Sequence, residues 1–269
     1  MTAALSPDDR PTTHAGSSAA GAPEPTAPLL ACRGVSKRYG GLLALDQVDL
    51  EVHPGEIVGL VGPNGSGKTT LLNLIGGSVP VSGGTITFEG RDVTREPAHR
   101  RAHSGISRTF QVPRPLPSLT VVDNVAVAAM FGRHRSSRAQ ALDEAAGILD
   151  RLGLTAQAAS ATSSLTLHER KFLEIARALA LRPRLLLLDE VLGGLNPTEA
   201  AAGVEMIAAL RDSGVSILYI EHNVKAVTTL ADRMYVLNRG RNLASGAPAD
   251  VIADPDVITA YLGSARARD

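Results

Sequence analysis

The chain has little cysteine, no net charge and no long apolar run. Cys32 is the one cysteine among 269 residues, so no disulfide can form within the chain, and we expect a reducing compartment and a buried, inert thiol. Lysine plus arginine and aspartate plus glutamate both total 27. This balance argues against a general binder of nucleic acid or another polyanion. No apolar run approaches the roughly 20 residues that span a bilayer, so we expect any membrane role to depend on a partner.

The length suits one large domain, or one domain with a subdomain, and a hydrophobic content of 44% supports a sizeable core. Residues 1–28 are rich in Ala, Pro, Ser, Thr and Gly, and they lack the basic start and the apolar centre of a secretion signal. We predict that they form a disordered tail. We expect residues 29–263 to form the folded domain and residues 264–269 to be frayed.

A glycine-rich stretch at 62–69 fits the pattern G-x-x-x-x-G-K-[ST] of a nucleotide-phosphate loop. An apolar run at 57–61 predicts a strand before it, and the apolar spacing at 70–75 predicts a helix after it. In that context the backbone N–H groups and the helix N-terminus can surround an anion. A glycine-rich turn without a ligand is disfavoured, because the lysine and the threonine stand where the motif requires them. The residues of the loop are Gly62, Pro63, Asn64, Gly65, Ser66, Gly67, Lys68 and Thr69.

Acidic residues follow a second apolar run. Residues 185–188 are four leucines, which are typical of a buried parallel strand. Asp189 and Glu190 come directly after them, at the strand end where open α/β sheets bind ligands. A further strand predicted at 215–220 ends in Glu221 and His222 in the same way.

The remaining segments predict an α/β fold with a P-loop NTPase core. We expect a mostly parallel sheet, an antiparallel β subdomain near 29–52, and an all-helical insert near 92–165. Helices are predicted from Thr166, whose pairing with Glu169 makes a capping box, and from Asn196. A hairpin around Gly240 and a helix at 255–262 complete the chain.

Two other stretches are less specific. Residues 92–103 are polar, and we interpret them as a solvated helical face, because no carboxylate or thiol stands at ligand spacing from His99 or His103. Three prolines between 113 and 117 predict an extended segment that acts as a hinge and contact loop. Tyr39 could stack on an adenine ring, although an exposed tyrosine is more often plain surface.

The ordered set of motifs resembles an ATP-binding subunit of an ABC transporter, over residues 29–262. Several stretches are similar to a narrower group, the branched-chain amino acid transport ATPases. The motifs of the wider family are Tyr39, 62–69, Gln111, 165–171, 185–190, Asn196 and His222, and the narrower stretches are 108–114, 173–179, 194–197, 220–223 and 260–263.

The resemblance implies roles for individual residues. Tyr39 would stack on adenine, Lys68 would reach the β- and γ-phosphates of ATP, and Thr70 would extend the loop's contacts. Thr69 and Asp189 would hold Mg²⁺, the latter through water. Three further roles are implied: Glu190 as general base on the hydrolytic water, Gln111 beside Mg²⁺ or that water, and His222 on the γ-phosphate.

The resemblance also implies partners. Such domains hydrolyse ATP as head-to-tail dimers, so we expect a second ATP-binding subunit, identical or different. Permease subunits would hold the protein at the cytoplasmic face of the membrane, and an extracytoplasmic solute-binding protein would act indirectly. Branched-chain amino acids are the leading solute, with other amino acids, amides and urea left open.

Two alternatives are disfavoured. A soluble ABC-type ATPase acting on ribosomes or DNA would usually have two ATPase domains or a long coiled-coil insert, and we expect no nucleic-acid partner. A GTPase would show an Asn-Lys-x-Asp motif, which the sequence lacks.

The signature segment departs from the family's usual Leu-Ser-Gly-Gly-Gln. Residues 165–169 are Leu-Thr-Leu-His-Glu, so Thr166 keeps the hydroxyl while His168 replaces a glycine. A side chain there hinders close approach to the partner's γ-phosphate, although it could supply a proton or charge, or the change could simply be tolerated. We hypothesise that, in a heterodimer, the site built on this chain's phosphate loop is active and the site completed by Thr166, His168 and Glu169 is slow.

Overall fold

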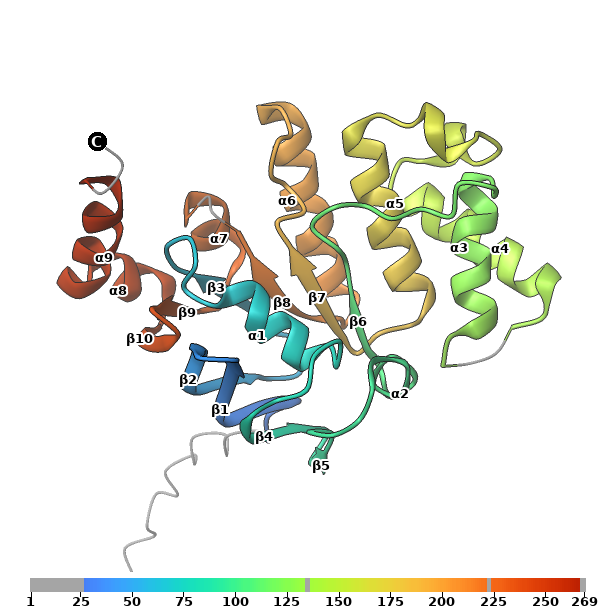
Figure 1. Cartoon of the computed structure of the whole chain (residues 1–269). Coiled ribbons are helices and arrows are strands. Elements are labelled where there is room, and N and C mark those ends of the chain that lie inside the picture. The colour runs from blue at the N-terminus through green and yellow to red at the C-terminus, as the bar shows by residue number, and fades with distance from the viewer. Residues whose placement is uncertain (1–26, 134–135, 222–223, 267–269) are drawn as a thin grey trace, which may run out of the picture.

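The computed structural model describes residues 27–133, 136–221 and 224–266. Figure 1 shows two sheets with helices around them, the helices α3, α4 and α5 at one end of the molecule and α8 and α9 at the other. Residues 1–26 of the predicted tail and 267–269 of the predicted frayed end lie outside the described residues. Residues 264–266 belong to the last helix, α9 (Pro255–Arg266).

The first sheet is antiparallel, with the strand order β2-β1-β4-β5. From Val48 to Val52 the strand β2 alternates buried side chains with more exposed ones, as expected of a sheet with one face on the core, whereas the first three residues of β1 are all buried. Cys32 lies on the buried face with no exposed surface, and burial raises the pKa of its thiol to about 12, which confirms the prediction of a buried thiol. The strands are β1 (Leu30–Tyr39), β2 (Leu42–Val52), β4 (Gly83–Phe88) and β5 (Arg91–Asp92).

The second sheet has the order β10-β9-β3-β8-β7-β6, and its neighbouring strands are parallel except for β9 and β10. Every residue of β3, β7 and β8 is buried, which explains why these strands are continuous apolar runs. The mostly parallel sheet and the hairpin at Gly240 are therefore confirmed. The strands are β3 (Ile57–Val61), β6 (Ile106–Arg108), β7 (Leu185–Asp189), β8 (Ser216–Ile220), β9 (Arg233–Asn238) and β10 (Arg241–Gly246).

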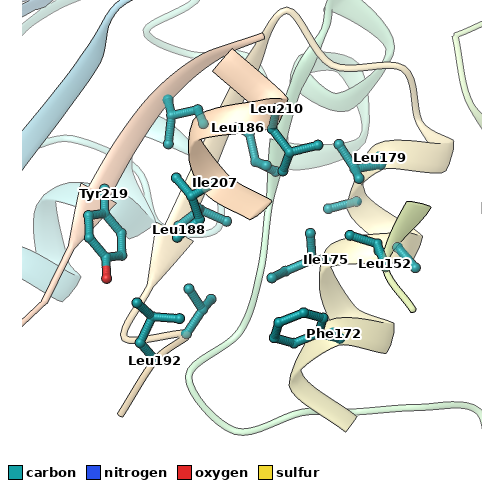
Figure 2. Packing of buried hydrophobic residues seen from close by; sticks show 14 of the residues in the cluster. Leu152, Phe172, Ile175, Leu179, Leu186, Leu188, Leu192, Ile207, Leu210 and Tyr219 are labelled. Atoms are coloured by element: carbon teal, nitrogen blue, oxygen red, sulfur yellow. The ribbon is translucent and has the colours of Figure 1, made fainter. Parts of the chain in front are cut away.

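The two faces of this sheet pack against different layers. Leu185 and Leu187 of β7 belong to a core shared with the antiparallel sheet and α1 (Lys68–Ile75). Leu186 and Leu188 belong to a core shared with the helices of the opposite face. Figure 2 shows this second core, where α5 and α6 bring side chains such as Phe172 toward the leucines of β7. The helices of that core are α3 (Val121–Phe131), α4 (Arg138–Arg151), α5 (Leu167–Ala180), α6 (Pro197–Asp212), α7 (Val224–Leu230), α8 (Pro248–Ala253) and α9.

Helix starts follow the predicted caps. The Thr166 side chain accepts from the Glu169 N–H, and the Glu169 carboxylate accepts from the Thr166 N–H, so the capping box that opens α5 is confirmed. Asn196 and Glu199 form the same box at the start of α6. Cap signals depend on neighbouring residues alone, which is why the sequence displays them clearly.

We predicted that the region 92–165 is all helical, and this prediction is wrong. The strand β6 lies inside the region and pairs in parallel with β7, Ile106 opposite Leu185. Three residues are too few to show a strand period. The helices of the insert therefore lie after β6, and they are α3, α4 and two short 3₁₀ helices at Thr155–Gln157 and Thr162–Ser164.

The helix α2 (Ala98–Ser104) also differs from the expected solvated face. His99 and His103 are not buried, but Arg101 is only 1% exposed. Its guanidinium donates to the carbonyl oxygens of Leu74 and Ile75, so it satisfies carbonyls that the last turn of α1 leaves without helical partners. Within the described ranges, no group of three or more His, Cys, Asp or Glu side chains could hold a metal ion. The helices of those ranges are all too short or too polar to cross a membrane.

Candidate functional site

The phosphate loop joins β3 to α1, and its glycines are required by both conformation and space. Gly62 has a φ of +148°, and a Cβ there would lie 2.1 Å from the carbonyl oxygen of Leu237. Gly67 has a φ of +108°, and a Cβ there would lie 2.5 Å from Leu45 Cδ2. No L side chain fits such positions, so the tight turn that directs N–H groups inward depends on glycine.

Lys68 is the first residue of α1 and is 5% exposed. Its ammonium donates to the carbonyl oxygens of Gly62 (2.7 Å) and Pro63 (3.0 Å). Burial lowers the pKa of Lys68, and the carboxylates of Glu190 and Asp189 oppose that shift. Two backbone carbonyl oxygens therefore hold the ammonium over the loop, and phosphate oxygens can replace them as acceptors.

A cleft of about 550 Å³ lies beside the loop. It is lined by 64–70 and by Tyr39, Leu42, Ala44, Gln111 and Glu190. The structure thus brings together residues that lie far apart in the sequence and that the motifs had singled out separately. Tyr39 is 44% exposed, and Lys37 Nζ lies 4.9 Å from the centroid of its ring.

The two acidic residues after β7 have different surroundings. Asp189 is 1% exposed, and its backbone N–H donates to Thr109 Oγ1 at 3.2 Å. Glu190 has a φ of +50°, a left-handed conformation that is strained for a side chain of this kind. Its N–H donates to the carbonyl oxygen of Ile220 at 2.9 Å, so β8 helps to hold the strained turn.

Gln111 and Glu190 touch in the cleft. Gln111 Nε2 donates to Glu190 Oε2 at 2.7 Å. The amide therefore fixes one carboxylate oxygen, and a movement of the segment that carries Gln111 changes the position of the acid.

Lys171 is a residue of the site that the sequence reasoning missed as a functional side chain. It lies in α5 and is 8% exposed, and its ammonium donates to the carbonyl oxygens of Glu190, at 3.0 Å, and of Gly193. Burial lowers the pKa of Lys171, while Glu221 and Glu190 oppose that shift. The sequence did contain one sign of this burial, because Lys171 directly precedes Phe172, a residue of the buried face of a predicted helix.

A third acid and the predicted histidine follow β8. Glu221 is 3% exposed and accepts from the N–H of Leu192 at 2.9 Å, so it supports the loop after Glu190. His222 lies outside the described residues.

Possible metal ligands meet at the inner end of the cleft. Thr69, Gln111 and Asp189 line an adjoining cavity of about 330 Å³, and Thr69 and Gln111 line the larger cleft as well. Hydroxyl, amide and carboxylate oxygens are hard donors that suit Mg²⁺, which usually binds proteins through one or two such groups together with phosphates and water. The residues present therefore fit a magnesium ion.

The signature residues lie elsewhere. Thr166, His168 and Glu169 do not line the cleft that holds Lys68. The His168 ring packs on the Phe172 ring with centroids 4.1 Å apart, while the neighbouring Leu167 is 50% exposed. The start of α5 is thus a separate surface of this chain.

Comparisons with known proteins agree with this arrangement. Residues 45–193 match the family model of the ABC transporter, and residues 241–267 match that of the branched-chain amino acid ATP-binding cassette transporter. The high-affinity branched-chain amino acid transport ATP-binding protein LivG of Salmonella typhimurium is 42% identical over 252 residues, which are 88% of this chain and 99% of LivG. The chain belongs to the ABC transporter ATP-binding proteins. The high-affinity branched-chain amino acid transport ATP-binding protein BraF of Pseudomonas aeruginosa is 39% identical over 254 residues, which cover 88% of this ABC protein and 99% of BraF.

A solved structure supports the fold of this ABC protein. The ADP conformation of an ATP-binding cassette of an ABC transporter superimposes with a TM-score of 0.80 and 30% identity, covering 88% of this chain and 100% of that one. The resemblance and the fold class inferred from the sequence are confirmed, and the protein is an ATP-binding ATPase of the ABC class.

Proposed function

We propose that this ABC ATPase powers the uptake of a small solute through separate permease subunits, with branched-chain amino acids as the solute. The main support for ATP hydrolysis is that residues of the phosphate loop, Gln111 and Glu190 line one cleft. The solute is supported by the names of LivG and BraF and by the match of residues 241–267. A soluble ABC ATPase that acts on ribosomes or DNA is not supported by these relatives.

The proposed roles follow from the positions of the side chains. Tyr39 stacks on the adenine, residues 62–67 surround the phosphates with the N–H groups of every residue but Pro63, and Thr70 adds to these contacts. Lys68 leaves the carbonyl oxygens of the loop to bind the β- and γ-phosphates. Thr69 and, through water, Asp189 would hold Mg²⁺ with Gln111 beside it, and the bound ion would neutralise charge at the phosphates.

Glu190 accepts the proton of the attacking water as general base. Gln111 holds its Oε2, and Lys171 fixes its backbone, so the carboxylate is placed before the nucleotide arrives. His222 is proposed to contact the γ-phosphate and to maintain the geometry of attack.

The second proposed partner is another ATP-binding subunit. The start of α5 does not serve the cleft of its own chain, and Leu167 beside it is half exposed. In a head-to-tail dimer Thr166, His168 and Glu169 would face the phosphate loop of the partner. Since His168 replaces a small residue there, we propose that the partner is a different subunit and that the two sites turn over at different rates.

The permease is proposed to bind the segment that follows β6. Phe110, Val112 and Leu116 are 40%, 68% and 37% exposed, and apolar side chains gathered on one short segment are typical of an interaction surface. Binding there would hold the protein at the cytoplasmic face of the membrane, while a solute-binding protein acts on the permease from the other side.

Co-purification tests this proposal. The full chain with an affinity tag is purified from solubilised membranes of cells that express it at native level, and the accompanying proteins are identified by mass spectrometry. We expect permease subunits and a second ATP-binding subunit, and a Val112→Asp variant should lose the permease. Recovery of ribosomal proteins or nucleic acid in place of a permease would contradict the proposal.

A further inference from the structure

Arg108 is a partly buried cation that contacts three parts of the site at once. It is the last residue of β6 and its side chain is 13% exposed. One guanidinium nitrogen, Nη1, donates to Asn73 Oδ1 of α1 at 2.6 Å, and the other, Nη2, lies 3.9 Å from Asp189 Oδ2. Its Cζ also lies 4.9 Å from the centroid of the Phe110 ring.

Each contact belongs to a different element of the machinery. Asn73 is on the helix that begins with Lys68, Asp189 is the carboxylate assigned to Mg²⁺, and Phe110 directly precedes Gln111. Burial lowers the pKa of Arg108, and the Asp189 charge opposes that shift. A planar guanidinium with fixed donor directions holds such partners in one geometry, which a lysine would not do.

We propose that Arg108 is a positioning residue that couples metal binding at Asp189 to the position of the segment 110–116. This inference rests on the proposed function of Asp189. With Mg²⁺ and a nucleotide bound, the Asp189 carboxylate would serve the ion through water as well as the guanidinium beside its Oδ2, and repulsion between the two cations would weaken this ion pair. The guanidinium then shifts against Asn73, and Phe110, which is stacked on it, moves together with Gln111.

The surroundings of Phe110 allow such a shift. The cavity of about 330 Å³ beside Asp189 is also lined by Phe110, Val112 and Arg108, so the ring is not packed on all sides. The coupling is reciprocal, because any two sites joined by one equilibrium influence each other by the same factor. A partner that binds the segment 110–116 therefore changes the affinity of the site for Mg²⁺ with nucleotide.

Arg114 provides a matched control for Arg108. Its Cζ lies 5.5 Å from the centroid of the same Phe110 ring, and the residue is exposed. No ion pair between Arg114 and Asp189 occurs among the described residues. Arg114→Gln therefore removes a cation from the ring but leaves the contacts of Arg108 with Asn73 and Asp189 in place.

The test uses a tryptophan reporter, because the natural chain has no tryptophan. Val112→Trp places the single indole on an exposed position of the segment. Emission is recorded for the full chain with a non-hydrolysable ATP analogue, first in EDTA and then after Mg²⁺ addition. Calorimetry measures nucleotide binding separately under both conditions.

We expect Mg²⁺ with the analogue to shift the emission of the reporter protein. In Arg108→Gln most of that shift should be lost, while binding of the analogue in EDTA is unchanged. Asn73→Ala should also reduce the shift, because it removes the α1 side chain to which the Arg108 guanidinium donates. The charge of Arg108 is unchanged in this variant. Arg114→Gln should keep the full shift.

Three outcomes would overturn the inference: an Arg108→Gln protein that keeps the shift, an equal loss in Arg114→Gln, or a reporter protein that binds Mg²⁺ with the analogue without any shift. If Arg108→Gln does not fold, Asn73→Ala decides the matter on the same criterion. Failure of the reporter protein to bind Mg²⁺ with the analogue at all would count against the proposed function instead.

Discussion

Replacing Lys171 with methionine tests how the structure holds Glu190 in place. The ammonium of Lys171 donates to the carbonyl oxygens of Glu190 and Gly193, and methionine fills a similar volume without donating. A hydrogen bond from a charged group contributes about 1.5–3 kcal/mol to stability. At the low end of that range, loss of the two bonds lowers the free energy of unfolding by about 3 kcal/mol. Relaxation of Glu190 from its left-handed conformation returns about 1 kcal/mol of strain.

The net fall in the free energy of unfolding is then about 2 kcal/mol, which corresponds to a Tm lower by roughly 4–8 °C for a chain of this size. The loss of catalytic rate should be larger than the loss of stability suggests. Once Glu190 relaxes, its carboxylate moves away from Gln111, and a displacement of about 1 Å in a reacting group can lower the rate by about 100-fold.

We therefore expect kcat for ATP to fall by about 10–100-fold with little change in KM, because the phosphate contacts lie in the loop at 62–69. Arg101→Met is the matched control. It also removes a buried cation that donates to carbonyl oxygens, those of Leu74 and Ile75, but at the end of α1 remote from Lys68. The control should lose stability and keep most of kcat.

Differential scanning fluorimetry and steady-state ATPase assays on the two variants give both quantities. A Lys171→Met protein that is less stable but has an unchanged kcat would show that Lys171 supports the fold alone. A higher KM with an unchanged kcat would place its effect on nucleotide binding and would refute the reasoning.

Three further predictions concern single residues. Gly62→Ala should abolish nucleotide binding in a calorimetric titration and lower Tm, because its Cβ would lie 2.1 Å from the Leu237 carbonyl oxygen; full binding by this variant would contradict the loop geometry. Cys32 should resist alkylation by iodoacetamide at pH 9 in the folded protein and react once urea unfolds it. The pKa of the Cys32 thiol rises from 9.0 to about 12 on folding, so the stability that the thiol contributes is present below pH 9 and is lost as the pH rises toward 12. The urea midpoint of the wild type should therefore fall relative to that of Cys32→Ala between pH 9 and 12, and a constant difference between the two midpoints would refute this. Glu190→Gln should stop most turnover of the complex with its partner, whereas the matching change in the partner should have a small effect; the reverse result would show that the asymmetry assigned to His168 is wrong.

The features that the sequence predicted well are those encoded within a few neighbouring residues. The phosphate loop at 62–69, the capping box of Thr166 and Glu169, and the leucines of β7 each show their role in a short window. The family resemblance was equally visible, because its motifs are short and keep a fixed order along the chain.

The features that the sequence did not show join residues that are distant along the chain. The buried side chain of Arg101 reaches α1 across 26 and 27 residues, and Gln111 reaches Glu190 across 79. A polar residue in a polar stretch gives no sign that it is buried, because burial depends on what packs over it. For the same reason the strand β6, with only three residues, became visible only through its pairing with β7.

The most direct test of the central claim measures ATP hydrolysis by the purified protein with its partner, with and without Mg²⁺, for the wild type and for Lys68→Ala. Lys68→Arg serves as the control that keeps the charge. The account predicts turnover that requires Mg²⁺ and that is lost in Lys68→Ala. Full turnover by Lys68→Ala, or a wild type that binds no nucleotide in the presence of Mg²⁺, would contradict it.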